Sequence, residues 1–109
     1  MKIELSPIAH VHNSRKEVTD DFWGDIISEI TLADGYNEDS LKGIEEFSHI
    51  EVLFYFDKVN PESIRKGAGH PRGNMRWPET GIFAQRGKNR PNKLGLTIVK
   101  LIKVQGNVL

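Results

Sequence analysis

Basic side chains gather in two loops of the sequence, "HPRGNMRW" (residues 70–77) and "AQRGKNRPNK" (residues 84–93). Together the loops carry Arg72, Arg76, Arg86, Lys88, Arg90 and Lys93, with Trp77 and Phe83 close by. Arginine grips carboxylates and phosphates through two parallel hydrogen bonds and stacks on bases, while lysine adds a point charge. Basic residues interleaved with aromatic ones are typical of a surface that binds RNA or a nucleotide-like ligand. A solvated charged turn is the alternative interpretation of the same residues.

Charge is divided unevenly along the chain of 109 residues, although its net charge is zero. Residues 1–64 hold fourteen acidic and five basic residues, whereas residues 65–109 hold ten basic residues and one acidic residue, Glu79. An asymmetry of this kind predicts an anionic partner for the basic part. The alternative is that the two halves interleave in one fold and neutralise each other.

Several kinds of site are excluded by the sequence itself. There is no cysteine, so the chain can form neither a disulfide framework nor a thiolate zinc site. The glycine patterns of Rossmann and P-loop phosphate sites do not occur. His10 and His12 share a strand face, but two imidazoles without a third ligand do not predict a metal site. The sequence has neither a signal peptide nor the roughly 18-residue apolar run of a membrane helix, which predicts a cytoplasmic protein.

The apolar pattern is mainly that of β-strands, and it sets the elements that must position these loops. Strands are expected over residues 2–12, 26–33, 49–59, 81–84 and 94–104. Residues 49–59 are apolar on both faces, which predicts a central strand.

Two short helices and a long loop are expected between the strands. One helix is capped by Asn37 and ends at Gly43, and the other begins at Asn60 with Pro61 in its first position. Residues 68–81 have no periodicity and are expected to form a loop. The elements together predict a mainly β single domain, a β-barrel or barrel-like sheet with short helical inserts rather than a Rossmann fold.

Four segments resemble the TsaA-like (TrmO) family of tRNA methyltransferases. "GIFAQRGKNRPNKLGLTIVKL" (residues 81–101) resembles the family pattern Gly-Val-Phe-Ala-Thr-Arg-Ser, two variable residues and Arg-Pro-Asn-Pro-Ile-Gly, followed by an apolar strand. "LKGIEEFSHIEVLFYFDKV" (residues 41–59) is similar to the family's Leu-x-Gly-Leu-Glu-x-Phe-Ser-His-Leu segment and the aromatic strand after it. "HPRGN" and the N-terminal "IAHVHNSR" also fit. The resemblance covers nearly the whole chain.

The resemblance implies a methyltransferase with a β-barrel outside the Rossmann class. Such enzymes use S-adenosylmethionine and are usually dimers. In the family's best-known member, the substrate is an adenosine beside the tRNA anticodon that already bears a threonylcarbamoyl group, and the methyl group goes to its exocyclic nitrogen. We therefore expect S-adenosylmethionine as cofactor, tRNA as substrate and a homodimer as assembly. No membrane and no metal are expected to take part.

The resemblance also implies roles for particular residues. The cofactor would be contacted by Arg86 above all, and further by Lys58, Val59 and Leu96. The segment Asp20, Asp21, Phe22 and Trp23 stands at the place of another contact, although its sequence departs from the family's. Asp57 and His49 could accept the proton that leaves the substrate nitrogen, as water also could. Phosphate contacts to RNA would be made by Arg72, Lys88, Arg90 and Lys93, which predicts strongly salt-dependent binding.

The sequence departs from the family pattern in two places. Gln85-Arg86-Gly87 replaces Thr-Arg-Ser and Lys93-Leu94 replaces Pro-Ile, so this loop is more cationic than the pattern. The family also continues with Leu-Asp-x-x-Asp-Gly-Thr-Pro-Val, which supplies part of the cofactor site, whereas this sequence stops at Leu109. We therefore expect one TsaA-like domain over residues 1–109 that is truncated at its C-terminal end. A non-catalytic RNA- or anion-binding module and a small-molecule methyltransferase of the same fold are the alternatives.

Overall fold

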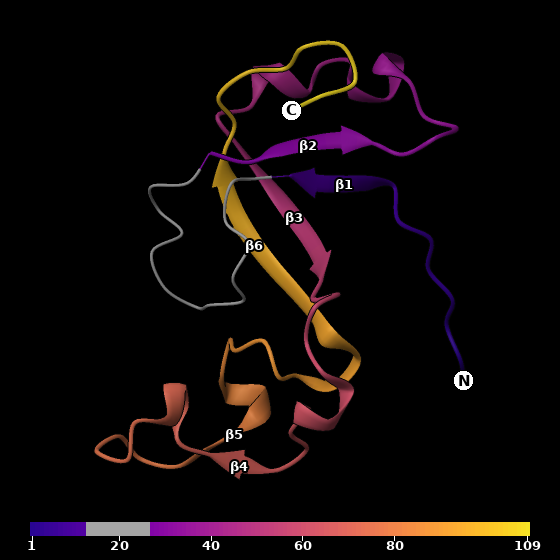
Figure 1. Cartoon of the computed structure of the whole chain (residues 1–109). Helices are drawn as coiled ribbons and strands as arrows, with labels where there is room; N and C mark the ends of the chain where they lie inside the picture. Colours follow the sequence, from indigo (N-terminus) through magenta and orange to yellow (C-terminus); the bar gives the residue numbers. More distant parts are fainter. Residues whose placement is uncertain (13–26) are drawn as a thin grey trace. The chain divides into compact units, whose positions relative to one another are not determined.

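The computed structural model describes residues 1–12 and 27–109, except for the side chain of Arg72. Its strands are β1 (Ala9–His12), β2 (Glu29–Leu32), β3 (His49–Tyr55), β4 (Ala68–Gly69), β5 (Thr80–Gly81) and β6 (Leu94–Lys100), labelled in Figure 1. They pair as three two-stranded sheets, β1–β2, β3–β6 and β4–β5. The expected mainly β class is confirmed, and a closed barrel stays a prediction. Among the described helices, none is long and apolar enough to cross a membrane.

The chain divides into two compact units. Of the described residues, the first unit contains 1–12, 27–50 and 98–109, and the second contains 51–97. The basic loops expected from the sequence therefore both belong to the second unit.

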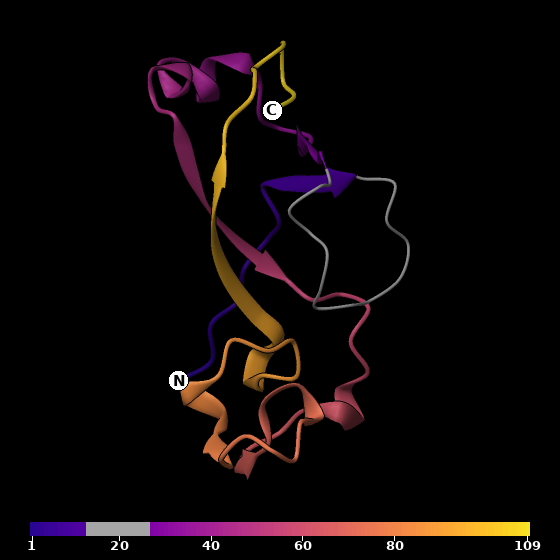
Figure 2. The same ribbon diagram turned by 90° about the vertical axis from the view of Figure 1, so that its left-hand side faces the viewer.

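Strand β2 lies between two partners in the first unit. It pairs antiparallel with β1 in the register Ala9↔Leu32 and His12↔Glu29. At its other edge, Ile30 exchanges two backbone hydrogen bonds with Leu109, at 2.8 and 2.9 Å. The C-terminal segment accordingly lies beside β2 in both views (Figure 1 and Figure 2). The last residues of the chain thus complete a small sheet around β2.

The two helical inserts that the sequence predicts form as 3₁₀ turns at their expected caps, Asn37 and Asn60. The helical elements of the described residues are 3₁₀ turns, namely η2 (Glu38–Leu41), η3 (Ile44–Glu46), η4 (Pro61–Ser63), η5 (Pro71–Gly73), η6 (Ile82–Ala84) and η7 (Pro91–Lys93). The Asn37 side chain accepts a hydrogen bond from the Asp39 N–H at 3.0 Å, and the Asn60 side chain accepts one from the Glu62 N–H at 2.9 Å. Both expected caps are confirmed, because an asparagine side chain satisfies an amide that the first helical turn leaves unpaired.

Several expected elements differ in the structure. The strands expected over residues 2–12 and 94–104 are shorter, Ala9–His12 and Leu94–Lys100. The strand over residues 81–84 is wrong beyond Gly81, since Ile82–Ala84 form the turn η6, closed by the Gln85 N–H donating to the Ile82 carbonyl at 3.2 Å. The expected loop over residues 68–81 contains the antiparallel pair β4–β5, with Ala68 opposite Gly81. Strands of two residues carry no periodicity, so the sequence pattern does not reveal them.

Strand β3 is not the doubly buried central strand that its composition predicts. Its side chains alternate between exposed and half-buried, and Leu53 and Tyr55 are 64% and 57% exposed. In the described part of the chain its single sheet neighbour is β6. Beyond the two ends of this pair, the Phe56 N–H donates to the Lys93 carbonyl and the Leu101 N–H to the Ser48 carbonyl, each at 2.9 Å.

Gly95, near the start of β6, lets this strand approach two aromatic rings of the second unit. An added Cβ at Gly95 would lie 2.6 Å from Phe54 Cζ and 3.0 Å from Phe56 Cε2. These two rings pack edge to face, with centroids 4.8 Å apart and an interplanar angle of 72°. The position is buried, so its backbone takes the place that a side chain would occupy.

Replacing Gly95 should therefore destabilise the fold. We expect Gly95→Ala to lower the free energy of unfolding by about 1–3 kcal/mol, because the new methyl group overpacks the two rings. Denaturant unfolding followed by circular dichroism measures this change. Gly67→Ala is the matched control, since among the described residues an added Cβ there meets nothing within 4 Å. Equal effects of the two substitutions would contradict the packing argument.

Candidate ligand-binding site

A pocket of about 160 Å³ lies in the second unit, where the first basic residue of the 84–93 loop meets the start of β6. It is lined by Phe54, Phe56, Arg86, Gly87, Arg90, Gly95, Leu96 and Thr97. Three stretches of chain therefore supply its wall: the end of β3 and the residue just beyond it, the loop that follows η6, and the first residues of β6.

Arg86 is held at this pocket by a backbone acceptor. Its Nη2 donates a hydrogen bond of 2.7 Å to the carbonyl oxygen of Leu96, although the side chain is exposed. The family resemblance implies that Arg86 and Leu96 both contact the cofactor, and this hydrogen bond brings them together. A guanidinium group has five N–H donors, so this single bond leaves others for a ligand.

The residue before Arg86 is also held by hydrogen bonds to backbone carbonyls. The Gln85 amide Nε2 donates to the carbonyl of Gly69 at 3.2 Å and to the carbonyl of Thr80 at 3.0 Å. Because these carbonyls belong to the two strands of the β4–β5 pair, Gln85 ties the end of η6 to both strands. Gln85 replaces the family's threonine, and its longer side chain serves this structural purpose.

The aromatic wall gives the pocket its apolar part. Phe54 and Phe56 are two residues apart, so they point to the same face, as the alternation of extended chain requires. Both rings are half-buried beside Gly95. Phenyl rings next to the guanidinium groups of Arg86 and Arg90 suit a ligand that combines a flat or apolar portion with an anionic group.

Lys93 is engaged within the protein rather than free for a ligand. Its Nζ donates to the Val59 carbonyl at 3.0 Å and lies 4.8 Å from the centre of the Tyr55 ring. Asn92 and Lys93 have φ angles of 64° and 53°, a left-handed conformation that asparagine tolerates and lysine rarely adopts. The side chain therefore ties the entry of β6 to the segment that follows β3, and a phosphate would compete with these contacts.

The remaining candidate residues lie apart from the pocket or partly outside the description. Lys58 is exposed and Val59 is buried, and neither lines the pocket. His49 belongs to the first unit, where its Nδ1 shares a hydrogen bond of 2.8 Å with Ser48 Oγ, whereas Asp57 is an exposed residue of the second unit.

Of the expected phosphate contacts, Arg90 lines the pocket and Lys88 is half-buried near it in sequence. Arg72 lies in η5, but its side chain is outside the description. The segment from Asp20 to Trp23 also lies outside the described residues. Within the described ranges, no group of three or more His, Cys, Asp and Glu residues could hold a metal ion.

Sequence reasoning missed the apolar half of the pocket. The sequence pattern places Phe54 and Phe56 only in a strand, and Gly95 only in a motif. Two phenylalanines at spacing two, followed later by a glycine within an apolar strand, do carry a signal, because a strand glycine often marks a close approach. Which strand approaches which ring depends on the pairing of β3 with β6, and that pairing is not local.

Removing the charge of Lys93 should loosen the segment around Val59. We expect Lys93→Met to lower the free energy of unfolding by about 1–3 kcal/mol, since a charged hydrogen bond and a cation–π contact are both lost. Thermal or denaturant unfolding measures the loss. Lys100→Met, at an exposed position of β6, removes the same charge as a control and should change stability by less. A Lys93→Met chain as stable as the original would show that the two contacts contribute nothing.

Comparison with known proteins confirms the resemblance found in the sequence. The family model of the tRNA-methyltransferase O N-terminal domain matches residues 15–109. The tRNA (adenine(37)-N6)-methyltransferase of Homo sapiens is 43% identical over 72 residues, which are 66% of this chain and 16% of the human protein. The S-adenosyl-L-methionine-binding protein of Archaeoglobus fulgidus is 37% identical over 87 residues, 80% of this chain and 58% of that protein.

A solved structure shows the same fold. The crystal structure of TrmO from Pseudomonas aeruginosa has a TM-score of 0.76 to this chain at 22% sequence identity, covering 99% of this chain and 47% of that one. This chain thus spans only part of the length of the proteins to which it is similar. Its matches of sequence and fold nevertheless agree, and the chain belongs to the family of the tRNA-methyltransferase O N-terminal domain.

Proposed function

We propose that this chain takes part in the S-adenosylmethionine-dependent methylation of an adenosine in tRNA, at the exocyclic amine of a threonylcarbamoyl-modified base. The names of the relatives support this proposal, since they include tRNA (adenine(37)-N6)-methyltransferases and S-adenosyl-L-methionine-binding proteins. The observation that carries it is the contact between Arg86 and Leu96 in one pocket, because the resemblance implies that both contact the cofactor.

The residues of the pocket fit the chemistry of this cofactor. The guanidinium group of Arg86 suits its carboxylate, and the rings of Phe54 and Phe56 suit its adenine or the methylene groups beside its sulfonium. The pocket of about 160 Å³ is smaller than the roughly 300–1,000 Å³ of typical small-molecule sites. We therefore assign to it one part of the cofactor, with Lys58 and Val59 as proposed contacts for another part.

Methyl transfer asks the protein mainly for alignment. When bound, S-adenosylmethionine supplies an electrophilic methyl group on a sulfonium sulfur. Arg86, restrained by the Leu96 carbonyl, would fix the carboxylate end, and the two phenyl rings would keep water from that side. Asp57 and His49 remain the proposed acceptors of the proton that leaves the substrate nitrogen. Asp57 has the stronger support, because it is exposed and immediately precedes Lys58.

The basic residues of the second unit would hold the RNA. We propose Lys88, Arg90 and Arg72 as phosphate contacts, which would make affinity fall steeply with salt. Lys93 was expected to join them, but its bond to the Val59 carbonyl supports a positioning role instead. By holding Val59, Lys93 would also hold the neighbouring cofactor contact Lys58 in place.

The assembly and location of the protein complete the proposal. We propose a cytoplasmic homodimer whose strands take part in a β-barrel. The likeness to TrmO over 99% of this chain supports the fold, and sheet edges without a partner are able to pair with a second chain.

The cofactor assignment is tested by calorimetric titration of the chain with S-adenosylmethionine at low salt. We expect Arg86→Ala to weaken binding by about 1.5–3 kcal/mol, the cost of losing a charge-assisted hydrogen bond. Arg86→Lys, which retains the charge, should lose less. Light scattering of the same samples should show a dimer.

Arg65→Ala is the matched control, because Arg65 belongs to the same unit but does not line the pocket. Each variant is checked for folding by thermal unfolding before titration. Unchanged affinity in folded Arg86→Ala would contradict the role of this residue. Binding of RNA by a folded chain that binds no S-adenosylmethionine would favour a non-catalytic RNA-binding module.

A further inference from the structure

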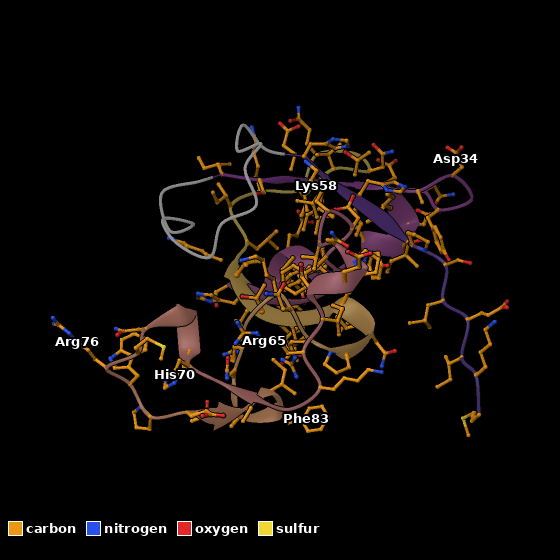
Figure 3. All side chains as sticks on the ribbon, turned by 60° about the horizontal axis from the view of Figure 1, so that its bottom comes forward. Asp34, Lys58, Arg65, His70, Arg76 and Phe83 are labelled. Atoms are coloured by element: carbon orange, nitrogen blue, oxygen red, sulfur yellow. The ribbon has the colours of Figure 1, made fainter. Side chains whose placement is uncertain are left out.

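The loop that joins β4 to β5, residues 70–79, presents large side chains to solvent in the second unit. Met75 is 76% exposed and Trp77 is 47% exposed, and Arg76 between them is also exposed. Figure 3 shows Arg76 projecting away from the ribbon. A tryptophan and a methionine beside an arginine supply the aromatic, adaptable apolar and cationic surface that binding sites use. We call residues 75–77 the hairpin tip.

The hairpin tip is held by hydrogen bonds within its own loop. The His70 Nδ1 donates to the Trp77 carbonyl at 2.9 Å, which closes the loop across seven residues. The Asn74 Oδ1 accepts from the Arg76 N–H at 2.9 Å, and the Asn74 carbonyl accepts from the Trp77 N–H at 3.1 Å. The backbone that carries all three exposed side chains is therefore restrained before any partner binds. Such preorganisation lowers the entropy cost of binding.

The base of the loop is restrained by the same residue that precedes Arg86. Gln85 donates to the carbonyls of Gly69 and Thr80, one on each side of the loop. Gln85 thus links the base of this loop, through hydrogen bonds, to its covalent neighbour Arg86 in the candidate site. The hairpin tip and the candidate site at Arg86 belong to the same compact unit, so one ligand could contact both.

We propose that the hairpin tip is a stacking platform for unpaired RNA bases, a proposal that rests on the proposed tRNA substrate. Trp77 offers an aromatic face to a base, Arg76 offers a charge to phosphate, and Met75 extends the apolar surface. Glu79 is the only acidic residue from position 65 to 109, so this part of the chain suits a polyanion. Because paired bases are hidden inside a duplex, stacking on tryptophan selects single-stranded RNA.

The test compares single-stranded with double-stranded RNA. The probes are a labelled oligouridine and a blunt RNA duplex of the same length, titrated with the 109-residue chain and followed by fluorescence anisotropy. We expect Trp77→Ala to weaken binding of the single strand by about tenfold and to leave duplex binding unchanged, since one stacked base is lost. Trp77→Phe should keep most of the affinity. Arg76→Ala should weaken both probes and lower the salt dependence by about one phosphate contact.

Tyr36→Ala is the matched control, because Tyr36 is 48% exposed but belongs to the first unit. It should leave both affinities unchanged. The proposal is overturned if the folded chain binds no single-stranded RNA, or if Trp77→Ala binds the single strand as the original chain does. Equal losses of affinity for the single strand and the duplex in Trp77→Ala also overturn it. A Trp77→Ala chain that loses the dimer in light scattering but keeps its RNA affinity overturns it as well, since the tip would then contact a second copy. Calorimetric titration with S-adenosylmethionine tests the cofactor assignment separately. Failure of the stacking proposal therefore does not imply failure of the cofactor assignment, and the reverse also holds.

Discussion

The close approach of β6 to two phenylalanine rings at Gly95 is the constraint on which the second unit depends. Because Gly95 has no side chain, Phe54 and Phe56 can both lie against the strand backbone while their rings pack edge to face with each other. Leu96 follows directly, and its carbonyl is then placed to accept the Arg86 hydrogen bond. Gly95 thus determines both the packing of the two rings and the position of the Arg86 side chain.

The cations of the 84–93 loop are not equivalent, although the sequence presents them as one basic run. Lys93 bonds to the Val59 carbonyl and lies over the Tyr55 ring, so its charge stabilises the fold. Arg90 and Arg86 line the pocket instead. Gln85, an uncharged member of the loop, joins η6 to the β4–β5 pair. Lys93, one of the charges that the family pattern lacks, therefore stabilises the fold rather than binding a ligand.

Local features of the sequence could be predicted, and non-local ones could not. The caps at Asn37 and Asn60 depend on residues two positions away, and both were anticipated correctly. The β4–β5 pair was missed because strands of two residues carry no pattern and because Gln85, sixteen residues from Gly69, helps to hold it. The pocket was only half predicted: Arg86 and Leu96 came from the family resemblance, whereas the part played by Phe54 depends on which strand pairs with β3.

We propose that Arg86, Leu96 and the rings of Phe54 and Phe56 frame a cofactor site. The most direct measurement is a nuclear magnetic resonance titration of the isotope-labelled chain with S-adenosylmethionine. We expect the largest shifts at the backbone amides of Gly87, Gly95 and Leu96, and small shifts at Thr31 and Gly106 in the first unit. No shifts in a folded chain, or the largest shifts in the first unit, would contradict the account.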